Sequence, residues 1–189
     1  MSVLLINGSP SRISKTAAIV TLLAARLSSA GATVDVVSVR DVPPEELVFG
    51  NAESPAIRAF LHLVTAARAV VVATPIYKAS YTGVLKALLD TIPPGSLAGK
   101  TILPLATAGT LAHFLALDYA MRPVLTFLGA RHILPNLFLT ESGFCDAGTV
   151  VLDDVTEERV AAAVHALLAA LEPIALQPAS AVALQPLTA

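Results

Sequence analysis

The sequence predicts an α/β protein in which one parallel sheet is covered by helices on both faces. Five apolar segments of β-type composition alternate with five segments of helical periodicity. Most of the apolar segments are uninterrupted, which is typical of strands buried on both faces of a parallel sheet. The 189 residues are enough for one well-filled domain and too few for two of ordinary size.

The expected elements follow one another as βα units along the chain. Ser54 followed by Pro55 is a typical start of a helix, and Gly31 is a typical end for the first one. The expected strands cover residues 3–7, 33–39, 69–74, 101–107 and 132–139, and the expected helices cover about 14–29, 55–67, 82–92, 111–128 and 154–171. Five such units in a row predict right-handed crossovers and a doubly wound sheet.

For five strands we expect the flavodoxin-like order 2-1-3-4-5. Such sheets bind ligands at the carboxyl ends of the strands, beside the switch point between strands 1 and 3. The loops after Asn7, Thr74 and Thr107 are therefore the candidate binding loops. We expect residues 1–172 to form one domain and residues 173–189, which lack helical periodicity, to form a loosely ordered tail.

Charge and hydropathy argue against two classes of partner. Net charge is −2 and no basic patch is visible, so nucleic-acid binding is not expected. The longest uncharged stretch, residues 101–117, is too short and too interrupted to cross a membrane.

The 55% hydrophobic content instead favours a covered sheet and subunit contacts, so we expect a homo-oligomer. A cytoplasmic location is expected because no secretory signal is visible and Cys145 is the single cysteine.

The first candidate loop, NGSPSRISKT at residues 7–16, resembles a triphosphate-binding loop only in part. That motif needs a second glycine before its lysine, but Ser14 stands there and the spacing from Gly8 is one residue too long. The third strand runs into Thr74-Pro75 rather than into an aspartate that could hold magnesium. The dinucleotide motif G-x-G-x-x-G is also absent, so an NTPase is not expected.

A single phosphate group suits this loop better. Its hydroxyl groups, the charges of Arg12 and Lys15, and the free N–H groups of the next helix could surround the terminal phosphate of FMN without a metal. In the alternative interpretation, Ser14 only caps the helix and the other hydroxyls face water. The loop alone leaves both interpretations open.

The second and third candidate loops suit a flat heterocycle. Residues 74–83 are rich in backbone amides and include Tyr77 and Tyr81, although these tyrosines could instead pack into the core. Residues 106–110 are small, which allows close approach of the backbone to a ligand. Thr110 could cap the next helix and direct N–H groups at an electron-rich ring edge.

Together the loops resemble those of the NAD(P)H-dependent FMN reductases of flavodoxin-like fold, most closely the reductase component of two-component alkanesulfonate monooxygenases. The matching segments are Gly8-Ser9-Pro10 with the loop that follows, ATPIYKA at 73–79, LPLAT at 103–107, and Ala112-His113 through DYAMRPVL at 118–125. The resemblance covers about residues 1–140. The chain departs from the pattern at Ala108, where the family has a second glycine.

The resemblance implies an NAD(P)H:FMN oxidoreductase. NAD(P)H would pass hydride to FMN, and the reduced flavin would go to a partner monooxygenase that desulfonates organosulfonates. No catalytic side chain and no metal are implied, because the cofactors carry the hydride transfer. The candidate FMN-binding residues are Ser9, Ser11, Arg12, Ser14, Lys15 and Thr16 for the phosphate, and Pro75, Ile76, Tyr77, Lys78, Thr107, Ala108, Gly109 and Thr110 for the ring.

The helix expected over 111–128 contains Pro123, which cannot donate to the carbonyl of Tyr119 and crowds it. A bend or a π-bulge would relieve the clash, and such bulges are common at functional sites. The resemblance implies an insertion here, with the tyrosine at a tetramer interface near the flavin. We therefore expect Tyr119 in a π-bulge, with a role in subunit contact and flavin exchange; the alternative is an ordinary proline kink.

Two other functions stay open at this point. A reductase with tightly bound FMN could act on quinones, azo compounds or metal ions. A flavodoxin-like electron carrier would use no NAD(P)H. The sequence does not distinguish NADH from NADPH or a dimer from a tetramer, and it does not name the partner oxygenase.

Overall fold

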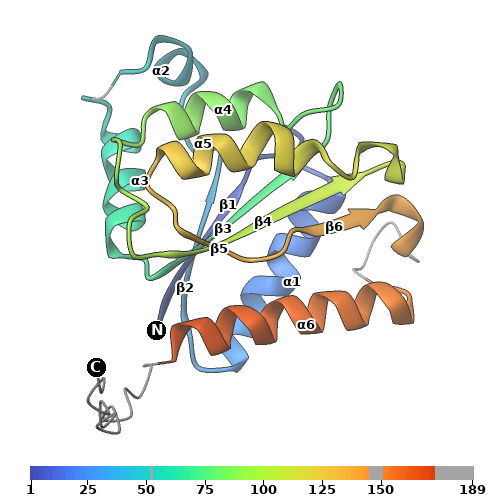
Figure 1. Cartoon of the computed structure of the whole chain (residues 1–189). Coiled ribbons are helices and arrows are strands. Elements are labelled where there is room, and N and C mark those ends of the chain that lie inside the picture. The colour runs from blue at the N-terminus through green and yellow to red at the C-terminus, as the bar shows by residue number, and fades with distance from the viewer. Residues whose placement is uncertain (52, 145–150, 173–189) are drawn as a thin grey trace, which may run out of the picture.

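The computed structural model describes residues 1–51, 53–144 and 151–172 of the chain. Within these residues the strands are β1 (Ser2–Asn7), β2 (Thr33–Ser38), β3 (Ala69–Pro75), β4 (Thr101–Ala108), β5 (His132–Ile133) and β6 (Leu137–Thr140). They form one parallel sheet between two layers of helices (Figure 1). The strand order β2-β1-β3-β4-β5 confirms the flavodoxin-like order expected from the sequence.

The helices cover both faces of the sheet, as expected. One face is covered by α1 (Lys15–Ser29) and α6 (Asp154–Leu171), and the other by α3 (Pro55–Ala66), α4 (Gly83–Asp90) and α5 (Arg122–Phe127) (Figure 1). A further short helix, α2 (Pro44–Phe49), packs beside α4. The sequence did not predict α2, because six residues are too few to show helical periodicity.

Side chains of β1 alternate between two separate cores. Val3 and Leu5 pack in the core under α1 and α6, whereas Leu4 and Ile6 pack in the core under α3 and α4. All four are at most 1% exposed. Because each such burial contributes about 2 kcal/mol, both faces of the strand must be apolar. This explains the uninterrupted apolar segments of the sequence.

The fifth strand is interrupted, whereas the sequence predicted one strand over 132–139. The N–H of Leu134 still donates to the carbonyl of Ile102 at 2.8 Å. Pro135 then has no N–H to donate, and pairing with β4 resumes only at Leu137, opposite Leu105. The strand is therefore divided into β5 and β6.

The segment after β4 is also divided, whereas the sequence predicted one helix over 111–128. A 3₁₀ turn (Leu111–His113) and a π-helical turn (Leu117–Met121) precede α5. The N–H of Arg122 donates to the carbonyl of Leu117, five residues earlier. The expected π-bulge at Tyr119 is confirmed, and the simple proline kink is excluded.

No helix in the described part of the chain is long and apolar enough to cross a membrane. The expected tail, residues 173–189, lies outside the described residues. The expected extent of the domain, residues 1–172, stays a prediction.

Candidate functional site

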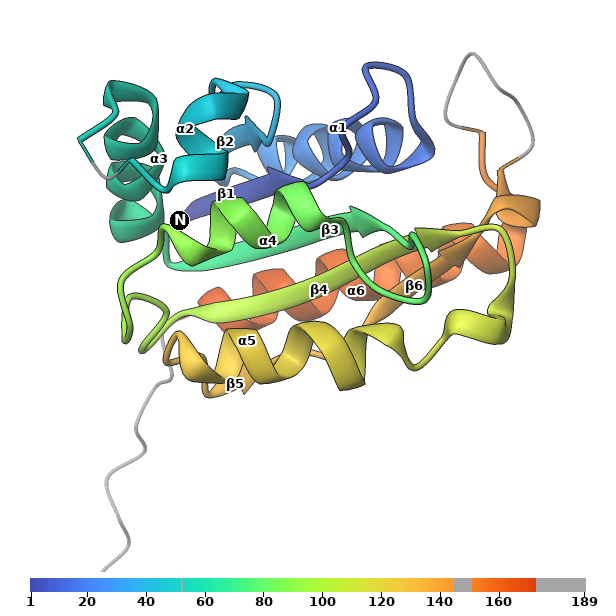
Figure 2. The same cartoon turned by 90° about the horizontal axis from the view of Figure 1, so that it is seen from above.

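The loop after β1 passes very close to β3. The N–H of Gly8 donates to the carbonyl of Ala73 at 2.7 Å. A Cβ on residue 8 would lie 2.8 Å from that carbonyl oxygen and 2.8 Å from the side chain of Leu85. Only glycine fits here without a shift of the backbone. The glycine thus brings the loop to the carboxyl edge of the sheet, where β1, β3 and β4 all end (Figure 2).

Two serine hydroxyls of this loop, which precedes α1, form hydrogen bonds within the chain. The N–H of Ser11 donates to Oγ of the buried Ser9 at 3.3 Å. Ser14 caps α1, because its Oγ accepts from the N–H of Ala17 at 3.0 Å. Ser14 thus caps the helix, and its contact with a phosphate stays a prediction. The first amides of α1 keep no partner within the helix. Arg12 is exposed and forms no ion pair with another described residue.

Three hydrogen bonds join the loops that follow β1, β3 and β4. The hydroxyls of Thr16 and Thr107, both buried, are 2.6 Å apart. Thr82 Oγ1 donates to the carbonyl of Gly8 at 2.7 Å, and the N–H of Ile76 donates to the carbonyl of Thr107 at 2.9 Å. The three candidate loops are therefore joined at the carboxyl edge of the sheet, and their binding of one ligand stays a prediction. Thr82, which sequence reasoning missed, also caps α4, and its place before a glycine and an apolar run was the available signal.

The loop after β3 is a tight hairpin. Tyr77 and Ser80 exchange two backbone hydrogen bonds, of 2.8 and 3.0 Å. Between them, Lys78 and Ala79 have φ angles of 51° and 62°, which are those of a type I′ turn. Left-handed backbone costs about 1–2 kcal/mol per residue when the residue is not glycine. Such strain is common at ligand sites, and the turn is exposed, whereas Pro75 at the end of β3 is buried.

The two tyrosines of this loop have different environments. Tyr77 is 48% exposed at the tip of the hairpin, where a ligand could contact its ring. Tyr81 packs against the core, which matches the alternative that the sequence left open. Burial raises the pKa of the Tyr81 hydroxyl, with a smaller opposing effect of Lys86 and a contribution in the same direction from Asp90. Tyr81 therefore stays neutral at physiological pH.

The loop after β4 changes from buried to exposed within two residues. Ala108 is the last residue of β4 and is buried, whereas Gly109 and Thr110 are exposed. Thr110 Oγ1 accepts from the N–H of Ala112 at 3.3 Å and so begins the next helical turn, as expected. This loop offers main-chain groups and little side-chain bulk at the carboxyl edge.

Two further residues beside the first loop were missed by sequence reasoning. Glu141 forms an ion pair with Lys15, with Oε2 and Nζ 3.2 Å apart. Arg40, at the end of β2, donates from Nη1 to the carbonyl of Pro10 at 3.0 Å. Both residues are distant in sequence from the loop, so no local pattern could have identified them.

The family comparison separates a reductase from an electron carrier, two of the functions that the sequence left open. A model of the family described as NADPH-dependent FMN reductase matches residues 1–144. The chain belongs to this family. It is therefore an FMN reductase that takes electrons from NAD(P)H, which confirms the enzyme class and the two cofactors expected from the sequence.

Individual FMN reductases agree with this assignment. The "FMN reductase (NADPH)" of Escherichia coli (strain K12) is 40% identical over 146 residues, which are 77% of this chain and 76% of the relative. The "NADH-dependent FMN reductase SfnF" of Pseudomonas putida is 32% identical over 146 residues, or 75% and 78% of the two chains. The relatives thus include enzymes named for either nucleotide.

Solved structures support the same fold. The apo form of the NADH:FMN oxidoreductase EMOB has a TM-score of 0.84 and 38% identity, over 90% of each chain. A flavodoxin from the Archaea has a TM-score of 0.57 and 15% identity, over 90% of this chain and 99% of its own. The second likeness shows the fold alone.

Proposed function

We propose that this FMN reductase releases reduced flavin to a separate flavin-dependent monooxygenase, in the desulfonation of organosulfonates. The observation that carries the proposal is the exposure of the loops that would contact the flavin ring. Tyr77, Lys78, Gly109 and Thr110 are all exposed. A ring lying against them stays accessible, so it can leave for a partner enzyme.

In this proposal the first loop binds the FMN phosphate. Arg12 supplies a charge that no other described residue pairs, and Lys15 supplies a second charge once it leaves Glu141. The first amides of α1 add N–H donors and the positive end of the helix dipole. The buried hydroxyls of Ser9 and Thr16 keep the loop in shape by their internal bonds. Ser11 lies between these groups and completes the set of hydroxyl donors.

The flavin ring in turn is expected to lie across the ends of β3 and β4. Pro75 and Ile76 would lie beneath it, the strained turn at Lys78 would meet its polar edge, and residues 107–110 would supply main-chain N–H groups. FMN and NAD(P)H supply the hydride chemistry when they are bound. The chain supplies alignment and keeps hydrogen-bond donors at the ring edge, so no acidic or basic side chain is required.

The experiment that tests release is NAD(P)H oxidation with and without added FMN. Strict dependence on added FMN is the expected result, because an enzyme that exchanges flavin is purified largely without it. Protein that is yellow and keeps its flavin on dilution would instead favour the alternative, a reductase that acts on quinones, azo compounds or metal ions. A chain that NADPH does not reduce rapidly in stopped-flow mixing would be an electron carrier.

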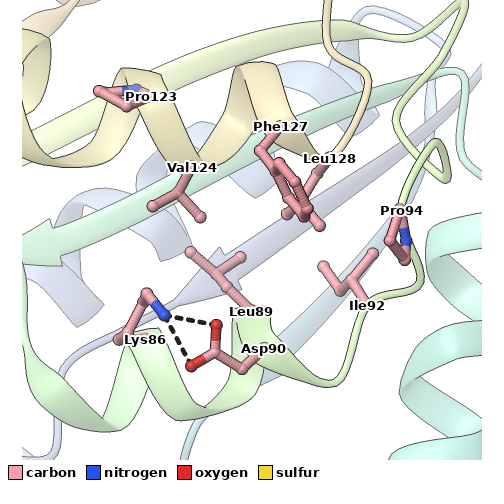
Figure 3. A pocket seen from close by; sticks show the side chains of 9 residues that line it. All are labelled: Lys86, Leu89, Asp90, Ile92, Pro94, Pro123, Val124, Phe127 and Leu128. Carbon is pink, nitrogen blue, oxygen red and sulfur yellow. Dashed lines mark hydrogen bonds and ion pairs between the residues drawn. The ribbon is translucent and has the colours of Figure 1, made fainter.

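We further propose that the outer side of the segment after β4 is a contact between copies of this chain. Its exposed apolar side chains, here called the apolar ridge, are Leu111, Phe114, Leu115, Tyr119 and Phe127. Beside Phe127, a groove of about 430 Å³ separates α5 from α4 (Figure 3). Leu89, Ile92 and Val124 line it, and the Lys86–Asp90 ion pair lies at its edge (Figure 3). An apolar surface of this kind favours a homo-oligomer, either dimer or tetramer.

Tyr119 is the residue of the apolar ridge with the clearest role in this proposal. Its side chain is 80% exposed, and it lies in the π-helical turn directly after the loop for the ring. Tyr119→Ala is expected to slow the release of FMN at least threefold and to weaken assembly. Stopped-flow fluorescence of FMN release and analytical ultracentrifugation measure the two effects. Val155→Ala on α6, a site on the opposite layer that is 67% exposed, is the control; identical behaviour of the two variants would contradict the proposed role.

A further inference from the structure

A second pocket opens beside the first loop, between α2 and α4, and no part of the flavin site described above uses it. Its volume is about 430 Å³, which is in the range of small-ligand sites. Its wall is mostly apolar, with Val39, Val42 and Leu47 on one side and Val84 and Ala87 of α4 on the other. Pro10 belongs both to this pocket and to the first loop, so the two sites are neighbours.

Arg40 is the charged residue in the lining of this pocket, and its position is fixed. Its Nη1 donates to the carbonyl of Pro10 at 3.0 Å. The turn that carries it is closed by three further bonds. The N–H groups of Arg40 and Asp41 donate to Oγ and to the carbonyl of Ser38, and the N–H of Ser38 donates to Asp41 Oδ2. The guanidinium is thus held at the rim while it stays exposed.

The charge of Arg40 has no counter-charge in the described residues. No carboxylate there lies within ion-pair distance of its guanidinium. The neighbouring carboxylate of Asp41 is turned toward the N–H of Ser38, at 2.7 Å. An exposed guanidinium with remaining N–H donors, placed beside an apolar pocket, suits a phosphate group on a sugar that also carries a flat aromatic base.

We propose that this pocket binds the adenosine end of NADPH and that Arg40 binds its 2′-phosphate. The proposal rests on the NAD(P)H-dependent reduction of FMN, which supplies an adenosine nucleotide as substrate. A nucleotide whose nicotinamide lies on the flavin ring runs past the first loop, and its adenosine reaches the pocket across Pro10. Arg12 and Lys15, at the start of α1, are left to the flavin phosphate. Arg40 then selects NADPH over NADH.

The first experiment measures nucleotide preference in Arg40→Gln. The ratio of kcat/KM for NADPH to that for NADH is expected to fall about tenfold, because one charge-assisted hydrogen-bond pair is lost. Calorimetry is expected to give the same loss of affinity for 2′,5′-ADP and no change for 5′-ADP. Arg68→Gln removes the same charge at the opposite edge of the sheet, where Arg68 precedes β3, and is expected to behave like the wild type. An unchanged ratio in Arg40→Gln would overturn the proposal.

The second experiment tests the pocket apart from the charge. Val84→Phe fills it from α4, and the KM values for NADPH and NADH are both expected to rise at least fivefold with FMN affinity unchanged. Val155→Phe, on the exposed side of α6, is the matched control. If Arg40→Gln or Val84→Phe weakens FAD relative to FMN and leaves both nucleotides unaffected, the pocket belongs to the adenosine of FAD and the proposal is wrong. A wild-type chain that oxidises neither nucleotide would refute the reductase function instead.

Discussion

The loop after β1 and the segment after β4 both border the proposed flavin site, but their side chains have opposite environments. In the loop, Ser9 and Thr16 are fully buried and hydrogen-bonded within the same chain. In the segment, Leu115, Tyr119 and Phe127 are each more than half exposed. One region is complete in a single subunit, and the other leaves apolar surface without a partner.

This difference separates two tasks that the proposed release of flavin requires. A loop closed by internal bonds keeps its shape when no phosphate is present, so binding FMN costs little ordering entropy. A segment with exposed apolar side chains can gain contacts only from another molecule. We infer that affinity for FMN depends on the first region, and that assembly and flavin exchange depend on the second.

The largest expected effect comes from crowding the first loop. Gly8→Ala places a Cβ 2.8 Å from the carbonyl oxygen of Ala73 and from Leu85, so the backbone must move. Unfolding in urea is expected to show a loss of about 3 kcal/mol. Gly83→Ala adds the same atom in open space at the start of α4 and is expected to be neutral or slightly stabilising. Equal stability of the two variants would show that the loop is not tightly packed.

The next effect comes from breaking the bond between the first and third loops. Thr16→Val leaves the buried hydroxyl of Thr107 without its partner at 2.6 Å, which costs about 2 kcal/mol. Thr107→Val is expected to cost a similar amount, and the double variant less than the sum, because the two hydroxyls are then removed together. Urea unfolding of all four proteins measures the coupling. Additive losses would mean that the two hydroxyls do not interact.

A smaller effect is expected from Glu141, which competes with the flavin phosphate for the charge of Lys15. Glu141 holds Lys15 at 3.2 Å, so Glu141→Gln frees this cation for the flavin phosphate. The Kd for FMN is expected to fall about threefold, since exposed ion pairs contribute less than about 1 kcal/mol. Fluorescence titration of FMN measures it. Glu53→Gln, which breaks the comparable pair with Arg58, is the control; tighter binding in both variants would point to net charge alone.

The smallest effect on folding is expected in the apolar ridge. Phe127→Ser removes a ring that is 74% exposed, so the stability of the isolated subunit should change by less than about 0.5 kcal/mol. Unfolding measured at concentrations where the chain is monomeric tests this. Sedimentation at higher concentration is expected to show weaker association than in the wild type. Unchanged association would remove Phe127 from the proposed contact.

Much of this molecule could be predicted from local patterns. The uninterrupted apolar segments predicted β1, β3 and β4, because burial on both faces requires them. The proline at 123 predicted a bend or a π-bulge, because its ring and missing N–H affect only the preceding turn of the same helix, and the family resemblance favoured the π-bulge that the structure has. The family resemblance rested on short segments of five to fourteen residues, which is also local information.

Other features depend on residues far apart in the chain. Thr16 meets Thr107, Thr82 holds Gly8, and Arg40 reaches Pro10. The interruption of the fifth strand at Pro135 depends equally on β4, which supplies the other half of the ladder. No local pattern contains these pairs, because they form only when parallel strands bring their carboxyl ends to one edge.

The sequence by itself determined the strands, because periodicity and composition set which faces must be buried, and five βα units in a row favoured the strand order that the structure has. Tertiary structure alone decided which loop groups bond one another and which stay exposed. The physical reason is that a hydroxyl or a guanidinium has the same short-range preferences everywhere in a chain. Only the fold decides whether its partner is a neighbouring loop or a ligand.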